Sequence, residues 1–214
     1  MRIAVLGTGA VGRNVAGRLA ELGHDVALGT RDPEATRARE DYSDVPGTRL
    51  ATFADAARDA DLVVNATNGG ATLDVLSRAG ADNLSGKVLL DLSNPLDFSQ
   101  GMPPTLLVKD TDSLAEQVQR AHPEARVVKS LNTMNNALMV HPESLADGDH
   151  TAFVAGDDDG AKAVVTGLLA ELGHRDVIDL GDLVGARGVE MILPLWVRLM
   201  GTLGTAHFQF KVVR

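Results

Sequence analysis

The chain of 214 residues contains no cysteine. This absence excludes disulfide bonds, thiol nucleophiles, and zinc or iron–sulfur centres held by cysteine. The six histidines also lack the spacing of a metal site. No apolar run approaches the roughly 18 residues that span a bilayer, and the longest, Met191 to Val197, is broken by Pro194. We therefore expect no metal and no membrane contact. Because strand-like sequence begins where a signal peptide would lie, we expect a cytoplasmic protein.

Positive charge is scarce as well. The formal net charge is −9 at pH 7, and the pI is near 5.0. Nucleic acids and anionic membrane surfaces attract basic proteins, so neither is an expected partner. A hydrophobic content of 44% is ordinary for a globular protein that buries a sizeable core. The length suits one domain, or one domain with a small appendage.

An apolar run at residues 3–6 leads directly into a glycine motif that opens a helical stretch. The motif is Gly7-Thr8-Gly9-Ala10-Val11-Gly12. In dinucleotide-binding units the first glycine makes a tight turn, the second lets the backbone approach a pyrophosphate, and the third allows close packing of helix on strand. The helix N-terminus adds unpaired N–H groups and a partial positive charge. The motif and its context therefore predict a dinucleotide site.

The far end of this unit distinguishes NADP from NAD. NAD sites usually place a carboxylate about 20 residues past the glycines, where it accepts hydrogen bonds from the ribose. Here the second strand ends in Gly29-Thr30-Arg31. The glycine leaves room, and a hydroxyl and a guanidinium suit a 2′-phosphate. Asp32 is either the ribose carboxylate displaced by a few residues or the cap of a helix that starts at Pro33. We favour the cap, and hence NADP.

Strand-like apolar runs alternate with helical patterns along the chain, which indicates a parallel α/β sheet. After the opening unit, strands are expected at residues 61–65, 87–91, 126–129, 151–154 and 176–178, the last of them buried. Helices are expected at residues 71–79 and 160–172. The segment 99–104 contains a glycine and two prolines, and is expected to be a loop.

The C-terminal tail differs in character. From residue 184 to 203 a helical stretch is apolar almost all round. Such a helix must be covered on most sides, either by a second subunit around Pro194 and Trp196 or by the monomer itself. Alternation of apolar and polar residues then predicts a closing strand that contains Phe208, Phe210 and Val212. His207 is the histidine of most interest, because it lies near a tail that could roof a cleft.

Ligands of open α/β sheets bind beyond the carboxyl ends of the strands. Three predicted central strands have an asparagine at or just after their carboxyl ends: Asn65 (with Asn68 nearby), Asn94 and Asn132. Asparagine is a common turn residue, but its amide also suits carboxamides, ribose hydroxyls and pyrimidine-like ring edges. The same edge has no His–Asp pair and no obvious catalytic lysine, since Lys129 precedes the end of its strand. We therefore predict cofactor contacts here and no catalytic side chain.

Further motifs follow in order along the chain. They are Ser93-Asn94-Pro95-Leu96, Lys129-Ser130-Leu131-Asn132-Thr133-Met134, Ala155-Gly156-Asp157-Asp158-Asp159, and Leu180-Gly181-Asp182-Leu183 with Ala186-Arg187. Together with the glycine motif and Gly29-Thr30-Arg31, they mean that the chain resembles, along nearly its full length, the coenzyme F420-dependent NADP oxidoreductases. It is also similar to the cytosolic reductase domain of the six-transmembrane metalloreductases, which moves a hydride from NADPH to flavin.

The resemblance implies a fold and an activity. The fold would be a Rossmann-type doubly wound parallel sheet with a small C-terminal helical and strand portion. Residues 1–150 would form the NADP-binding domain, and residues 151–214 would complete the second-cofactor cleft and make a homodimer contact. The activity would be hydride transfer between NADP(H) and the deazaflavin coenzyme F420, with the two rings stacked. Such transfer is mostly positioning, which agrees with the missing acid–base residues.

The resemblance also implies roles for particular residues. Thr30 and Arg31 match the pair that binds the 2′-phosphate, and Arg37 is the candidate for a further basic residue there. The segment Asn65-Ala66-Thr67-Asn68 matches the one beside the nicotinamide ribose. The deazaflavin would lie between Asn94-Pro95-Leu96 and Asn132-Thr133-Met134, where Asn132-Thr133 replaces a histidine-containing loop of the family. Leu96 and Met134 would contact its ring.

Two other functions stay open. FMN and FAD share the pyrimidine edge of a deazaflavin, so an NADPH-dependent flavin reductase is one alternative. The other is a non-catalytic NADP(H)-binding sensor that reports redox state to a protein partner and needs no second cofactor. The asparagine edge favours the enzyme, with small-molecule redox cofactors as its partners.

Overall fold

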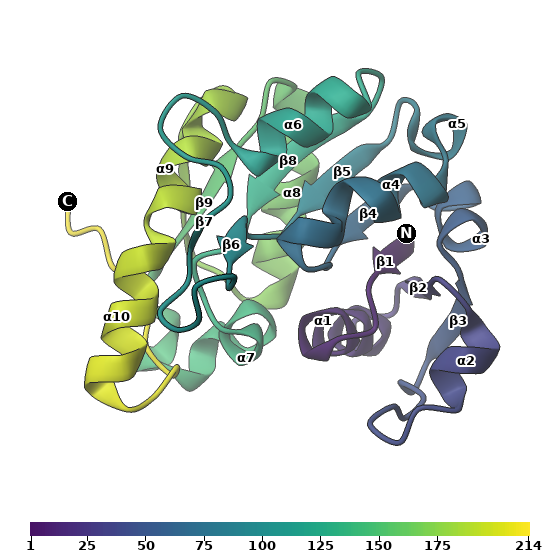
Figure 1. The fold of residues 1–214 in the computed structure, drawn as a ribbon, viewed down its shortest axis with the longest axis horizontal. Helices are drawn as coiled ribbons and strands as arrows, with labels where there is room; N and C mark the ends of the chain where they lie inside the picture. Colours follow the sequence, from purple (N-terminus) through teal and green to yellow (C-terminus); the bar gives the residue numbers. More distant parts are fainter.

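The N-terminal apolar run forms strand β1 (Arg2–Leu6) in the interior of an eight-stranded sheet. The computed structural model describes residues 1–214 and places helices on both faces of the sheet (Figure 1). The other strands of this sheet are β2 (Asp25–Thr30), β3 (Thr48–Thr52), β4 (Leu62–Asn65), β5 (Val88–Asp91), β8 (Arg126–Ser130), β9 (Thr151–Ala155) and β10 (Asp176–Asp179).

The spatial order of the strands is β10-β9-β8-β5-β4-β1-β2-β3. From β3 to β8 all neighbours are parallel, while β9 pairs antiparallel with β8 and parallel with β10. The six parallel strands follow the order of a dinucleotide-binding Rossmann sheet, with β8 in the sixth place. The predicted doubly wound α/β fold is therefore confirmed.

Each face of β1 belongs to a different core. Ile3 and Val5 pack under α1 (Ala10–Glu21), α7 (Asn136–Val140) and α8 (Asp159–Leu172). Ala4 and Leu6 pack on the opposite face, under α3 (Phe53–Arg58), α4 (Thr72–Ala79) and α6 (Leu114–Ala121). A parallel strand that is buried on both faces is apolar throughout, which explains the continuous run that predicted it.

The remaining elements lie at the margins. They are α2 (Pro33–Arg37), α5 (Ala81–Leu84), a hairpin of β6 (Leu96–Asp97) and β7 (Thr105–Leu106), α9 (Ala186–Met191), α10 (Leu193–Leu203), and four short 3-10 helices at Gly69–Ala71, Pro142–Ser144, Ala146–Gly148 and Leu183–Gly185. In Figure 1, α9 and α10 occupy the end of the molecule opposite to α2 and β3. None of the helices has both the length and the apolar character required to span a membrane.

The glycine motif packs as its sequence predicts. Gly7 turns at φ +119°, a conformation that side chains disfavour, and a Cβ on Gly12 would lie 1.9 Å from the Gly7 carbonyl oxygen. Gly29 differs from expectation. A Cβ there would lie 2.8 Å from Leu6 Cδ2 and 3.3 Å from Phe53 Cδ1. Its missing side chain therefore serves the packing of β2 in the core, and does not leave room for a phosphate.

The tail differs from prediction in three ways. The expected helix over residues 184–203 is two helices, α9 and α10, that part at Ile192 because Pro194 stands in the first turn of α10. Residues 208–212 form no strand; Thr151 N–H donates to the Phe210 carbonyl, but no ladder continues from it. The strand at residues 176–178 is half-buried at the sheet edge, not fully buried.

The predicted boundary at residue 150 falls between two neighbouring strands of one sheet. β8 precedes it and β9 follows it, and Ser130 pairs directly with Val154. β10 extends the same sheet by one more strand. Residues 151–179 thus continue the sheet of residues 1–150, and the helices α9 and α10 then fold back beside it (Figure 1).

Candidate functional site

The loops after β1, β4, β5 and β8 enclose a cavity of about 270 Å³ at the carboxyl edge of the sheet. This is the edge at which open α/β sheets bind their ligands. The lining residues are all uncharged: Val11, Ala66, Thr67, Asn68, Gly69, Leu92, Ser93, Asn94, Leu96, Met134, Asn135, Asn136 and Met139. The cavity therefore offers amides, hydroxyls and apolar contacts, and no ionisable side chain.

The structure brings together many of the residues expected at the site. Those that line the cavity are Val11, Ala66, Thr67, Asn68, Asn94, Leu96 and Met134. Pro95, Asn132 and Thr133 lie in the same loops without lining it, and Asn132 and Thr133 are buried. His207 does not line the cavity either. Its Nε2 lies 3.3 Å from the Ser144 carbonyl oxygen, so it does not roof the cleft as the sequence suggested.

The glycine loop supplies the phosphate end of the site. Gly9 caps α1 without a side-chain hydrogen bond, and the first turn of α1 contains no acidic residue. A Cβ on Gly9 would meet nothing within 4 Å, so the backbone here is open to approach. The unpaired N–H groups of Ala10 and Val11 are thus available to an anion, and the helix dipole favours one.

At the end of β2 the two residues expected to bind the 2′-phosphate differ in exposure. The Arg31 side chain is 70% exposed, and its guanidinium lies 3.8 Å from Asp74. Thr30 is 6% exposed, and its hydroxyl pairs at 2.7 Å with the hydroxyl of Thr36. Asp32 caps α2 by accepting N–H bonds from the first turn, with Pro33 as the first helical residue. Arg31 is therefore free to meet a ligand, while the Thr30 hydroxyl has an internal role.

A second arginine lies against the glycine loop, and it is not the one expected. Arg37 points to Asp44, at 3.7 Å. Arg39 instead donates from Nη1 to the Thr8 hydroxyl at 3.3 Å, and its other nitrogens hold Asp41 at 2.7 and 2.9 Å. No periodicity in the chain singles out Arg39. Its place follows from the turn after α2, which the pattern of the chain did not predict.

Asn65 serves the interior of the protein. It is fully buried, and its amide donates to Asp91 at 2.7 Å while its oxygen accepts from the Thr67 hydroxyl at 2.6 Å. The Thr67 hydroxyl lines the cavity, so Asn65 supports the cavity wall from behind. The expectation that the Asn65 side chain meets the cofactor is corrected accordingly.

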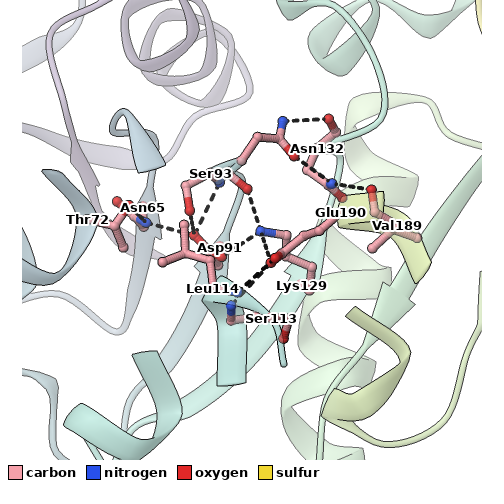
Figure 2. A network of polar contacts seen from close by, with 12 residues as sticks. Asn65, Thr72, Asp91, Ser93, Ser113, Leu114, Lys129, Asn132, Val189 and Glu190 are labelled. Atoms are coloured by element: carbon pink, nitrogen blue, oxygen red, sulfur yellow. Dashed lines mark hydrogen bonds and ion pairs between the residues drawn. The ribbon is translucent and has the colours of Figure 1, made fainter. Parts of the chain in front are cut away.

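Behind the cavity lies a cluster of three buried charges, Lys129, Asp91 and Glu190 (Figure 2). Lys129 Nζ lies 2.8 Å from Asp91 Oδ2 and 2.9 Å from Glu190 Oε1, and it also donates to the Ser93 carbonyl. Burial by itself lowers the pKa of Lys129, but the two carboxylates outweigh it and hold the pKa above its ordinary value. Lys129 is therefore a fixed cation.

From the sequence, Lys129 was noted inside its predicted strand but without a partner, and Glu190 was not predicted at all. Lys129 lies in an apolar strand run and Glu190 in an apolar helical run. A charged residue is almost never fully buried unless it is paired. A charged residue inside an apolar run therefore indicates a buried partner of opposite charge, and this signal could have been used for both Lys129 and Glu190.

Asn94 and Asn132 form an amide pair across the loops after β5 and β8. Asn132 Nδ2 donates to Asn94 Oδ1 at 2.9 Å and to the Val189 carbonyl at 2.8 Å, while Asn94 Nδ2 donates to the Asn132 carbonyl at 2.9 Å. Figure 2 shows Asn132 beside Val189, which precedes Glu190 in α9. Asn132 thus fixes Asn94 and α9 to one another, and Asn94 is the member of the pair that lines the cavity.

The fold and this cavity agree with what comparison of the chain with known proteins finds. The profile of the family described as NADP oxidoreductase coenzyme F420-dependent matches residues 2–95. The F420-dependent NADP reductase of Methanocaldococcus jannaschii is 31% identical over 212 residues, which cover 93% of this chain and 92% of the relative. The chain belongs to this family. A crystal structure from Arthrobacter sp. FB24, provisionally named an F420-dependent NADP reductase, matches this member with a TM-score of 0.98 and 60% identity over the whole of both chains.

A third relative is larger than this F420-dependent NADP reductase family member. Metalloreductase STEAP3 of Rattus norvegicus is 30% identical over 200 residues, which cover 91% of this chain and 38% of the relative. The similarity therefore concerns one part of that protein.

Proposed function

We propose that this protein transfers a hydride between NADP(H) and coenzyme F420. The observation that carries the proposal is the uncharged cavity beside an open glycine loop, in a chain that matches an F420-dependent NADP reductase over 93% of its own length. A loop of this kind binds a pyrophosphate, and the cavity beyond it has room for a planar ring. A cytoplasmic location, as expected from the sequence, is part of the proposal.

NADP(H) would lie across the carboxyl ends of β1, β2 and β4. The N–H groups at the start of α1 would hold its pyrophosphate, because they are the free donors of the loop. Arg31 and Arg39 would meet the 2′-phosphate, since both lie near the end of β2 or the glycine loop and carry a permanent positive charge. Ala66, Thr67 and Asn68 would face the nicotinamide end.

The second ring would lie between the loops that follow β5 and β8. Leu96 and Met134 offer apolar contacts on the two sides, and Asn94 offers a fixed amide. When both are bound, NADPH supplies the hydride and the deazaflavin ring accepts it. The cavity residues orient the rings and exclude water, and none of them has to titrate for this.

Anaerobic stopped-flow spectroscopy tests the proposal. NADPH is mixed with enzyme and F420, FMN or FAD, and bleaching of the acceptor is followed. We expect turnover with F420. A flavin is the second candidate acceptor, favoured by the resemblance to the reductase domain of the six-transmembrane metalloreductases and by the ring edge that flavins share with deazaflavins. Turnover with a flavin but not with F420 would identify the protein as a flavin reductase. Tight NADPH binding without any turnover would favour a non-catalytic NADP(H)-binding sensor.

A further inference from the structure

The cluster of Asp91, Lys129 and Glu190 contains one more negative charge than positive. The side chains of Asp91 and Lys129 are 0% exposed, and that of Glu190 is 1% exposed. Burial of an isolated charge is strongly unfavourable, whereas a buried ion pair has no net charge. A third charge, which leaves the group with a net charge of −1, adds a further burial cost that the packing of β5 against β8 does not require.

Both carboxylates accept several hydrogen bonds. Asp91 accepts from Asn65 Nδ2 at 2.7 Å, from Ser93 Oγ at 2.8 Å and from Ser93 N–H at 3.2 Å, besides Lys129. Glu190 accepts from the N–H groups of Leu114 and Ala115 at 2.7 and 3.2 Å, at the N-terminus of α6. Every one of these partners is a hydrogen-bond donor, as a carboxylate oxygen requires. With two carboxylates and one ammonium, the cluster has a formal charge of −1.

The Asp91 end of the cluster lies directly behind the cavity wall. Ser93 lines the cavity, and its hydroxyl is the group that donates to Asp91. Thr67 also lines the cavity and reaches Asp91 through Asn65. The thirteen lining residues include no cation that would screen the cluster from a bound ring.

We infer that this buried cluster favours the oxidised nicotinamide over the reduced one. The inference rests on the proposed function, because it needs NADP(H) in the cavity. When the C4–H bond of the dihydronicotinamide breaks, the hydride takes two electrons to the acceptor, and the nicotinamide ring changes from neutral to a cation. A fixed negative charge in a medium of low permittivity stabilises that cation. Bound NADPH thereby becomes a stronger hydride donor than free NADPH.

The test compares the dissociation constants of NADP⁺ and NADPH, measured by calorimetry without any acceptor. Glu190→Gln removes one negative charge from the cluster. The ratio of the NADP⁺ dissociation constant to the NADPH dissociation constant is therefore expected to rise about tenfold. Asp91→Asn should move the ratio in the same direction. Glu116→Gln is the matched control, because Glu116 joins α6 to α9 through Arg187 at 2.6 Å but lies outside the cluster. Its ratio should equal that of the wild type.

The double variant Lys129→Met with Glu190→Gln separates charge from structure. It restores a net charge of −1 on Asp91, which keeps its donors from Asn65 and Ser93. We expect its ratio to return toward the wild-type value, whereas a purely structural cluster would be damaged further. An unchanged ratio in both single variants would overturn the inference. Failure of the wild type to bind either nucleotide would instead overturn the proposed function.

Discussion

At the scale of one residue, we expect Arg31 to distinguish NADPH from NADH. Its side chain is 70% exposed and has only a long contact of 3.8 Å to Asp74. A hydrogen bond to a charged group contributes about 1.5–3 kcal/mol. Arg31→Ala should therefore weaken NADPH binding on the order of 10- to 100-fold, while NADH binding, which involves no 2′-phosphate, stays nearly unchanged. Titration of both nucleotides into both proteins measures this, and equal losses would show that Arg31 does not contact the phosphate.

Arg39 should contribute to the same discrimination. Its guanidinium already bonds Thr8 in the glycine loop, and Asp41 holds it in place. We expect Arg39→Ala to weaken NADPH binding about tenfold, with a smaller effect on NADH. Arg37→Ala is the control, since the guanidinium of Arg37 lies 3.7 Å from Asp44 and not against the glycine loop. A loss with the control as large as that with Arg39→Ala would contradict the assignment.

Those parts of the candidate site that depend on one residue type, such as glycine, could be predicted from the sequence. The roles of side chains that depend on hydrogen-bond partners elsewhere in the chain could be predicted less well. Gly7 and Gly12 have packing and backbone roles that no other residue fills, so their spacing was decisive. Asn65 and Asn94 were both found by their place after a strand, yet one is fully buried and the other lines the cavity. Which way an amide turns depends on partners such as Asp91, which come from another strand and leave no local pattern.

At the scale of elements, buried parallel strands were the easiest to predict. A strand such as β4 or β8 is covered on both faces and is marked by a continuous apolar run. β3 was not predicted, because it lies at the sheet edge and its sequence is half polar. The alternation around Phe210 matched a strand, but this segment is held by Phe208 stacked on Trp196 and by side-chain contacts at Asp176. Periodicity cannot tell such an anchored segment from a strand.

His174 makes the junction of α8 and α7 sensitive to acid. It is 5% exposed, its Nε2 lies 3.0 Å from the Met139 carbonyl, and its Nδ1 is buried without a partner. Burial lowers the pKa of His174 below its ordinary value of 6.5, so the folded state favours the neutral ring. Stability is then complete above pH 6.5 and is lost as the pH falls toward the folded pKa. His150 and Glu143 are the titratable groups that act on it from nearby.

Replacement of this ring tests the acid sensitivity. Denaturant unfolding at a series of pH values between 7 and 5 should show a decrease in stability for the wild type. In His174→Gln the amide can still donate to the Met139 carbonyl, so the decrease should be smaller, although the stability at pH 7 is lower. Parallel curves for the two proteins would assign the acid sensitivity to other groups.

At the scale of the whole molecule, α10 and the loop before β7 present exposed apolar side chains. Met102 is 64% exposed, Leu195 52% and Leu203 54%. We expect this surface to be covered by a second copy of the chain, because exposed apolar patches on a small protein mark interfaces. Trp196, which the sequence placed at the dimer contact, stacks on Phe208 of its own chain at 5.0 Å. The contact is therefore expected through Leu195 and Leu203.

Light scattering at micromolar concentration should give twice the mass of one chain. Leu195→Asp should give the mass of a single chain, because it places a charge in the expected apolar contact. Leu73→Asp on α4 is the control, since Leu73 is also exposed, at 39%, but lies on another helix. A wild type that stays monomeric at high concentration would exclude the dimer.

Two of the loops that line the cavity, those after β4 and β5, approach each other closely. A Cβ on Gly69 would lie 2.0 Å from the carbonyl oxygen of Asn94, so the loops after β4 and β5 touch through their backbones. That part of the cavity wall is backbone packed on backbone, so it can widen only if the main chain moves. Another part of the lining is formed by Met134 and Met139, whose unbranched thioethers adapt to irregular shapes. Any tolerance for differently substituted rings therefore resides in these two methionines, and a chain evolving toward a new acceptor would change there first.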